Sequence, residues 1–309
     1  ACLVGSEMCI RDRIFDPADG SVNQITPPTY DMEGAAVSPE GSRILYWGVS
    51  FEGIRPDYRQ LMLYDLATGQ TRSLVPDGKY RITQVGWWGT DIWFEGGDPH
   101  TSVSRSPKLY LLNPATGDCR TFCAPDGFLG TSAIGDMSLG GGKVCAVQGD
   151  SLYAVRLQRD VTALLRFDKV GNFAPVASYE GIACFDIIGE NAYLAAFRDH
   201  RPQELYRQPL SGGEPERLTQ FHDAFLETRQ ISRPEHITFR SRDGQEVDGW
   251  VIRPSGYEPG KKYPGVLNIH GGPKAAYGSQ YYHEMQLLAA GGRFVFCLLY
   301  TSPSPRDMR

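Results

Sequence analysis

Four consecutive residues carry the clearest chemical potential: His270-Gly271-Gly272-Pro273, which directly follow the apolar run GVLNI. Glycines at the end of a strand let backbone N–H groups point into a cleft, because no Cβ blocks the approach. Such N–H groups can stabilise the oxyanion formed during acyl transfer, and losing one donor typically slows the reaction by about 10²–10³. HGG alone is a weak signal, but HGGP between a strand and a helix is more specific. It predicts an oxyanion-hole loop.

The elements expected around this loop are those of an α/β domain. Residues 236–254 alternate around Asp243-Gly244, which predicts a β-hairpin. Residues 265–270 predict a buried apolar strand ending at the loop. Residues 279–290 predict a helix with Ser279 as its N-cap, and RFVF begins another strand. Hairpin, strand, glycine loop, helix and strand are the opening of an α/β domain.

The preceding part of the chain contains a repeat. Each copy is a short apolar strand, a turn with glycine and a second strand, and a further strand pair precedes most copies. The copies are LMLYDLATGQTRSL (61–74), LYLLNPATGDCRTF (109–122), ALLRFDKVGNFAPV (163–176) and ELYRQPLSGGEPERL (204–218). Four short strands per repeat are typical of one blade of a β-propeller. A β-sandwich with similar turns is the alternative.

The two ends differ from the rest. Residues 2–12 and 297–307 can be encoded by opposite strands of one oligonucleotide, which resembles a sequencing-library adapter. We therefore expect residues 1–13 and 297–309 to be sequencing artefacts, and the protein's own segment to be 14–296.

The run from Pro234 to Phe296 resembles the start of the catalytic domain of the prolyl oligopeptidase family of serine peptidases, in its acylaminoacyl-peptidase and dipeptidyl-peptidase-like branch. The matching stretches are PEHITFRSRDGQEVDGWVIRP, KKYPGVLNIHGGP, YG and HEMQLLAAGG before RFVF. That family carries a β-propeller before its hydrolase domain. The resemblance therefore implies a partial propeller of about four recognisable blades at 14–218, a linker at 219–235, and the start of an α/β-hydrolase domain at 236–296.

The resemblance also implies a Ser-His-Asp triad with the serine in a GxSxG elbow. No GxSxG occurs in the sequence, so no catalytic residue is assigned, and the triad is expected beyond Phe296. The match to the family motif implies that Gly272 supplies the oxyanion donor, while His270 and Gly271 shape the turn and Pro273 fixes its exit. His270 is not assigned as the base. The fragment itself is expected to be inactive.

Composition narrows the class of protein further. A net charge of −5 without a Lys/Arg block argues against nucleic-acid and anionic-membrane partners. No apolar run approaches the ~20 residues of a membrane span. The seven cysteines form no zinc-type spacing and favour free thiols in a reducing compartment such as the cytoplasm. No cofactor or metal is expected, and a homo-oligomer is left as an alternative to a monomer.

Other motifs receive structural interpretations. His283-Glu284 is half of HExxH, but Leu287 stands where the second histidine is needed. Trp87-Trp88 is expected to pack between blades. His222-Asp223 is interpreted as a surface or interdomain pair.

Three hypotheses follow for the complete protein. The leading one is a serine-type peptidase that hydrolyses short peptides, with the propeller restricting access to the active site. The alternatives are a carboxylesterase of the α/β-hydrolase fold and a non-catalytic propeller that serves as a binding scaffold.

Overall fold

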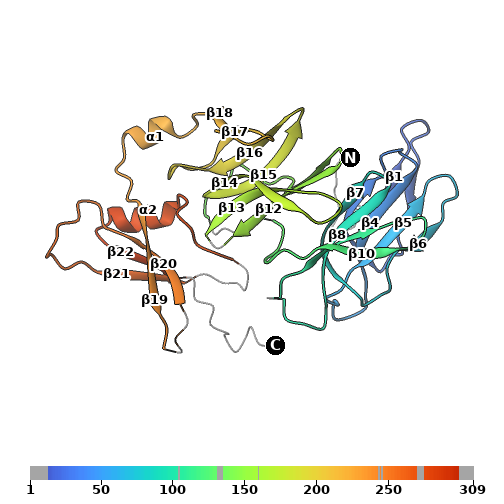
Figure 1. Ribbon diagram of the computed structural model, residues 1–309, viewed down its shortest axis with the longest axis horizontal. Coiled ribbons are helices and arrows are strands. Elements are labelled where there is room, and N and C mark those ends of the chain that lie inside the picture. Colours follow the sequence, from blue (N-terminus) through green and yellow to red (C-terminus); the bar gives the residue numbers. More distant parts are fainter. Residues whose placement is uncertain are drawn as a thin grey trace. The chain divides into compact units, whose positions relative to one another are not determined.

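The computed structural model describes residues 13–298 apart from 104, 131–134, 159, 243, 245 and 270–274. The chain divides into two compact units, Ala1–Asp126 and Gly127–Arg309. Each unit is built mostly from small β-sheets (Figure 1). In the described part, no helix is long and apolar enough to cross a bilayer.

The first unit holds a short strand pair and two four-stranded antiparallel sheets, with orders β3-β4-β5-β6 and β10-β9-β8-β7. The strands are β1 (Arg13–Phe15), β2 (Val22–Gln24), β3 (Tyr30–Val37), β4 (Arg43–Ser50), β5 (Gln60–Asp65), β6 (Thr71–Ser73), β7 (Arg81–Trp88), β8 (Asp91–Gly97), β9 (Lys108–Leu112) and β10 (Cys119–Cys123).

The second unit begins with two more sheets of the same kind, with orders β11-β12-β13-β14 and β15-β16-β17-β18, here called the third and fourth sheets. Their strands are β11 (Cys145–Gln148), β12 (Ser151–Gln158), β13 (Val161–Phe167), β14 (Phe173–Tyr179), β15 (Gly181–Ile188), β16 (Asn191–Phe197), β17 (Glu204–Pro209) and β18 (Glu216–Arg217).

The sequence repeat corresponds to the last hairpin of each of these four sheets: β5–β6, β9–β10, β13–β14 and β17–β18. The turn position shared by the four copies needs a positive φ, which glycine adopts without a Cβ clash. The φ angles there are +68° at Gly69, +80° at Gly117, +103° at Gly171 and +102° at Gly213. The predicted hairpins are therefore confirmed. Closure of such sheets into a propeller stays a prediction.

In the first unit the two four-stranded sheets pack against each other (Figure 1). Leu45 and Leu61 of one sheet and Ile92 and Phe94 of the other belong to a single buried cluster. Trp87 joins this cluster, and its indole N–H donates to the Ala36 carbonyl at 3.1 Å. Of the Trp87-Trp88 pair, Trp87 is thus found between two neighbouring sheets. That these sheets are propeller blades stays a prediction.

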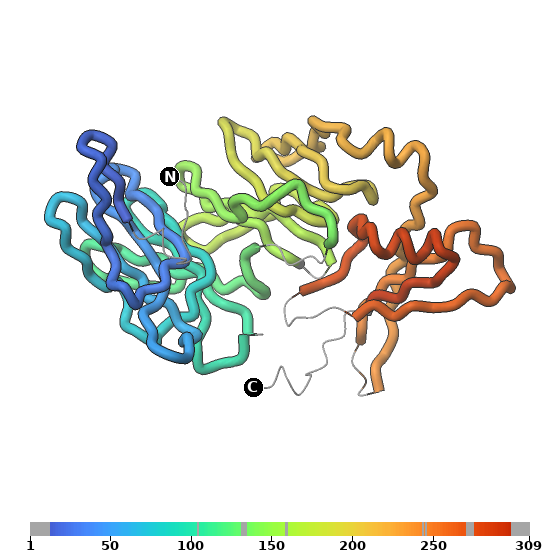
Figure 2. Tube along the Cα trace, turned by 180° about the vertical axis from the view of Figure 1, so that it is seen from behind, coloured from blue at the N-terminus to red at the C-terminus, as the bar shows by residue number. Residues whose placement is uncertain are grey.

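The last sheet has the order β19-β20-β22-β21 and is the part that bears on the predicted loop. Its elements are β19 (Pro234–Arg240), β20 (Glu246–Ile252), β21 (Gly265–Ile269), α2 (His283–Ala290) and β22 (Phe294–Leu298), and α1 (Asp223–Glu227) precedes them. β19 and β20 form the predicted antiparallel hairpin, whereas β21 and β22 run parallel. A parallel pair needs a crossover connection, and α2 provides it. Figure 2 shows α2 beside this sheet.

Apolar side chains join α2 to the sheet. Met285 and Ala289 of the helix are buried with Trp250, Ile252 and Val295 of β20 and β22. These residues recur at helical spacing on α2 and at every second position on the strands. Met285 and Ala289 therefore form the buried apolar face of α2.

Two details differ from the sequence-based expectations. The helix begins at His283 with Tyr282 as N-cap, not at Ser279, because its first N–H groups find their partner elsewhere in the chain. β21 was expected to be buried, but Leu267 and Ile269 are 53% and 64% exposed. Only one face of this strand meets covering side chains in the described part of the chain. At the C-terminal side, β22 continues past Phe296 through Cys297 and Leu298, and Cys297 is buried.

Candidate active site

The predicted oxyanion loop follows the carboxyl end of β21. The last residue of that strand, Ile269, pairs with Leu298 at the end of the parallel strand β22. In sheets with parallel strands, ligands bind in the crevice outside the carboxyl ends. The four predicted site residues His270, Gly271, Gly272 and Pro273 lie outside the described residues. Their assignment to an oxyanion hole therefore stays a prediction. The residues on either side of the loop are described, and their contacts follow.

A hydrogen bond joins the two sides of this loop. The Tyr277 hydroxyl donates to Asn268 Oδ1 at 2.5 Å, so a side chain after the loop is tied to the strand before it. Tyr277 is only 5% exposed, and burial raises the pKa of its hydroxyl, so the group stays a protonated donor at neutral pH. Sequence reasoning noted only the YG pair here and missed this bond.

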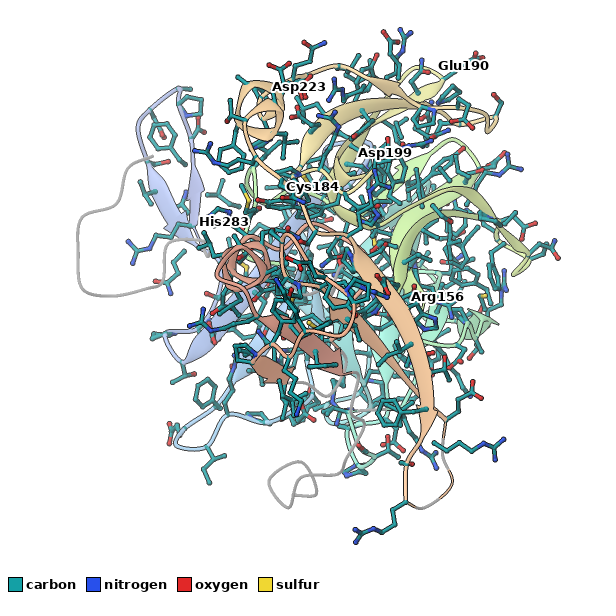
Figure 3. The ribbon with its side chains drawn as sticks, turned by 90° about the vertical axis from the view of Figure 1, so that its left-hand side faces the viewer. Arg156, Cys184, Glu190, Asp199, Asp223 and His283 are labelled. Carbon is teal, nitrogen blue, oxygen red and sulfur yellow. The ribbon has the colours of Figure 1, made fainter. Side chains whose placement is uncertain are left out.

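The segment after the loop lies against the third and fourth sheets. A Cβ on Gly278 would sit 2.3 Å from the backbone carbonyl oxygen of Asp160, so only glycine fits at this approach. His200 Nδ1 lies 2.8 Å from the Ser279 carbonyl oxygen, which it contacts as a donor. These contacts come from the β12–β13 turn and the β16–β17 loop, where Asp199 is labelled in Figure 3.

The start of α2 is held by a carboxylate from the connection between β10 and β11. Asp136 Oδ1 accepts the backbone N–H of His283 at 2.8 Å, and Oδ2 accepts that of Glu284 at 2.7 Å. His283 is labelled in Figure 3 on the first turn of the helix. Asp136 therefore supplies the cap that sequence reasoning assigned to Ser279.

Glu180 and His200 form a half-buried pair beside this segment. The His200 backbone N–H donates to both Glu180 carboxylate oxygens, at 3.1 and 3.2 Å. Burial raises the pKa of the Glu180 carboxyl, and the neighbouring His200 offsets part of that rise. Asp199 and His200 have φ angles of 59° and 55°, a conformation that non-glycine residues seldom adopt. The turn thus directs the His200 ring towards Ser279.

The His222-Asp223 pair has separate partners and does not form a dyad. His222 Nδ1 lies 3.1 Å from Glu204 Oε1, whereas Asp223 accepts hydrogen bonds from Arg201 and Arg217. Asp223 begins α1 (Figure 3). The structure therefore agrees with the interpretation of His222-Asp223 as a structural pair and not as a catalytic dyad.

Glu204 anchors the connection out of the fourth sheet. Its side chain is fully buried and accepts from the Thr219 hydroxyl, the backbone N–H groups of Phe221 and His222, and the His222 ring. Burial alone would raise the pKa of Glu204, but these hydrogen bonds outweigh it and leave the pKa below its usual value. The carboxylate is thus a structural anion.

The last chemical candidate is the half-HExxH sequence at the start of α2. Among the described residues, no group of three or more His, Cys, Asp or Glu side chains could hold a metal ion. Leu287, the position at which HExxH would require histidine, is 61% exposed on α2.

The chain is similar in sequence to named peptidases. It is 34% identical over 184 residues to the uncharacterized peptidase YuxL of Bacillus subtilis (strain 168), covering 58% of this chain and 27% of that protein. It is 22% identical over 239 residues to dipeptidyl-peptidase 5 of Porphyromonas gingivalis, covering 77% of this chain and 26% of that protein. The chain thus spans about a quarter of the length of these relatives. No family model matches it.

Solved structures share its fold at low sequence identity. A Mycobacterium tuberculosis puromycin-hydrolyzing peptidase superposes with a TM-score of 0.68 at 16% identity, over 92% of this chain and 44% of that one. The acylaminoacyl peptidase of Pyrococcus horikoshii gives 0.62 at 19% identity, over 93% and 53%. Prolyl endopeptidases give 0.64 at 12% identity. Together with the relatives in sequence, these matches agree with the resemblance to the prolyl oligopeptidase family carried by residues 234–296.

Proposed function

We propose that this chain is part of a serine-type peptidase that hydrolyses short peptides. The observation that carries the proposal is the position of the HGGP sequence directly after β21, where a parallel strand pair reaches its carboxyl end. Similarity to peptidases in both sequence and fold supports it.

The chemistry expected of the loop is stabilisation of the tetrahedral oxyanion. In the complete protein, the backbone N–H of Gly272 donates to the oxyanion while a serine attacks the scissile carbonyl and a histidine takes its proton. The Tyr277–Asn268 hydrogen bond supports this role, since it holds the two flanks of the loop together. The serine, aspartate and histidine are proposed to follow Phe296 in the complete protein. The 309-residue chain, which has no GxSxG, is accordingly inactive.

The four antiparallel sheets are proposed to be blades of a propeller that limits access to this site. The contacts of the Gly278–Glu284 segment with the β16–β17 loop of the fourth sheet, and with Asp136 in the connection that leads into the third sheet, support such an arrangement. A ring of rigid blades beside a catalytic cleft admits short flexible peptides and excludes folded proteins.

The test begins with recovery of the intact gene across Phe296. We expect a GxSxG elbow followed by Asp and then His, and labelling of the complete protein by a fluorophosphonate. Replacement of the elbow serine by alanine should abolish labelling, and the 309-residue chain should not label. The complete protein should cleave short peptide anilides and leave folded proteins intact.

Three outcomes would contradict the proposal. Absence of the serine elbow, or failure of the complete protein to label, would favour a binding scaffold. Hydrolysis of short acyl esters without hydrolysis of peptide anilides would favour a carboxylesterase. Rapid cleavage of folded proteins would contradict only the proposal that the propeller restricts access to the active site, and not the proposed peptidase activity.

A further inference from the structure

The helix α2 has no cap from its own neighbourhood. Tyr282 at the N-cap position has an extended backbone, with φ −132° and ψ 112°, and no side-chain capping bond. The first N–H groups of any helix lack partners within the helix and must find them elsewhere. A capping side chain usually comes from the N-cap residue itself. Here the acceptor is Asp136, which lies 147 residues before His283.

The geometry at this helix end suits a carboxylate. One oxygen of Asp136 accepts from His283 N at 2.8 Å and the other from Glu284 N at 2.7 Å, so both oxygens are used. Hydrogen bonds to an ionised group are shorter and stronger than neutral ones. The positive end of the helix dipole adds to the attraction. The contact is therefore directional and depends on both oxygens.

The capping bonds belong to a set of contacts along one short segment. Ser279 is held through its carbonyl by His200, and Gly278 lies against the Asp160 backbone. Gln280 is 3% exposed and packs beside Gly181. Residues 278–284 are thus held by the β12–β13 turn, the start of β15, the β16–β17 loop and Asp136. This is the segment that leads from the predicted oxyanion loop into α2.

We propose that Asp136 is a positioning residue that couples α2, and with it the exit of the loop after β21, to the third and fourth sheets. In its catalytic part this inference rests on the proposed function. The oxyanion exists only in the transition state, so movement of its donors lowers kcat more than it changes KM. Asp136 touches no reacting atom and acts through the helix it caps.

The first experiment measures backbone hydrogen exchange in the complete protein. Asp136→Ala removes both acceptors, and we expect exchange in residues 283–290 to accelerate by roughly twofold to thirtyfold, as for the loss of a helix cap. Asp136→Asn keeps one acceptor oxygen and should give a smaller acceleration. Exchange in β12 and β13 should not change. Asp150→Ala, on the exposed turn between β11 and β12, is the matched control and should leave α2 unchanged.

The second experiment measures steady-state kinetics of the same variants on a short peptide anilide. For Asp136→Ala we expect kcat to fall about tenfold with KM little changed, within the range that a displacement of about 1 Å can cost. Asp136→Asn should recover part of the loss, and Asp150→Ala should behave as the unmodified protein.

The two readouts separate this inference from the proposed function. Unchanged exchange in α2, or equal acceleration in β12 and β13, overturns the coupling. Faster exchange in α2 with unchanged kcat overturns the positioning role and leaves only a stabilising cap. If the unmodified complete protein has no peptidase activity, the proposed function fails, while the exchange result still decides whether Asp136 couples the helix to the sheets.

Discussion

Replacement of Glu204 by alanine should destabilise the second unit strongly. The side chain is fully buried, and four donors converge on its two oxygens: the Thr219 hydroxyl, the backbone N–H groups of Phe221 and His222, and the His222 ring. Removing one partner of a buried charged network typically costs about 3–5 kcal/mol, since the other groups are left without an acceptor. We expect a loss of that size in the free energy of unfolding at pH 7.

Two further variants show how the loss of unfolding free energy depends on the acceptor oxygens and on burial. Glu204→Gln keeps one acceptor oxygen and should cost roughly 1–3 kcal/mol, the penalty for a few unsatisfied donors. Glu190→Ala, an exposed glutamate on the turn between β15 and β16 of the same sheet, should change stability by less than about 0.5 kcal/mol. Glu190 is labelled in Figure 3. The assay is urea unfolding of each variant followed by fluorescence and circular dichroism.

The pH dependence provides an independent check. Because the folded-state pKa of Glu204 is lowered, its contribution is fully present above the unfolded pKa of about 4.3 and is lost as the pH falls through the folded value. The difference between the unmodified chain and Glu204→Ala should therefore shrink in acid. A loss below about 1 kcal/mol at pH 7, or equal effects of Glu204→Ala and Glu190→Ala, would refute the assignment of Glu204 as the anchor.

Two other predictions concern the contacts beside the predicted loop. Burial raises the pKa of Glu180, so this carboxyl stays protonated to a higher pH in the folded chain than in the unfolded chain. The free energy of unfolding should therefore fall as the pH rises from about 4.3, the unfolded pKa, towards the raised folded pKa. Glu180→Gln should flatten this part of the urea-unfolding profile between pH 4 and 7, and parallel profiles would contradict the shift. Gly278→Ala should cost about 1–3 kcal/mol, because the added Cβ meets the Asp160 carbonyl. Gly141→Ala, which adds its Cβ in open space, is the control for the same thermal-melting measurement, and equal melting temperatures would contradict the close approach.

Local turn chemistry could be predicted from the sequence because its cause is local. The glycines of the repeated hairpins, such as Gly69 and Gly171, occupy left-handed positions that few other residues adopt. The turns around them are also set by near neighbours: Asp168 accepts backbone N–H groups of residues 170 to 172. The succession of elements in the last sheet (hairpin, strand, helix and strand) also followed from local sequence patterns.

The capping of α2 could not be predicted, because its cause lies far away in the chain. Ser279 has the residue type of an N-cap, but its carbonyl is engaged by His200 and the helix begins four residues later. Nothing near Asp136 in the sequence indicates a helix start. The exposure of Leu267 and Ile269 also depends on which neighbours cover β21, which a single apolar run does not specify.

The distant cap of α2 has a consequence for how the chain folds. An isolated helix of eight residues is marginal in water, where about 12–15 residues are needed even for good helix formers. This helix gains its cap only when Asp136, 147 residues earlier in the chain, has come close to it. The chain must therefore lose the conformational entropy of closing that long loop before the cap can stabilise the helix. Synthesis from the N-terminus produces the third and fourth sheets before α2 exists, and they can serve as the template on which it forms. The helix should accordingly be among the last elements to acquire protection during folding and among the first to lose it during unfolding.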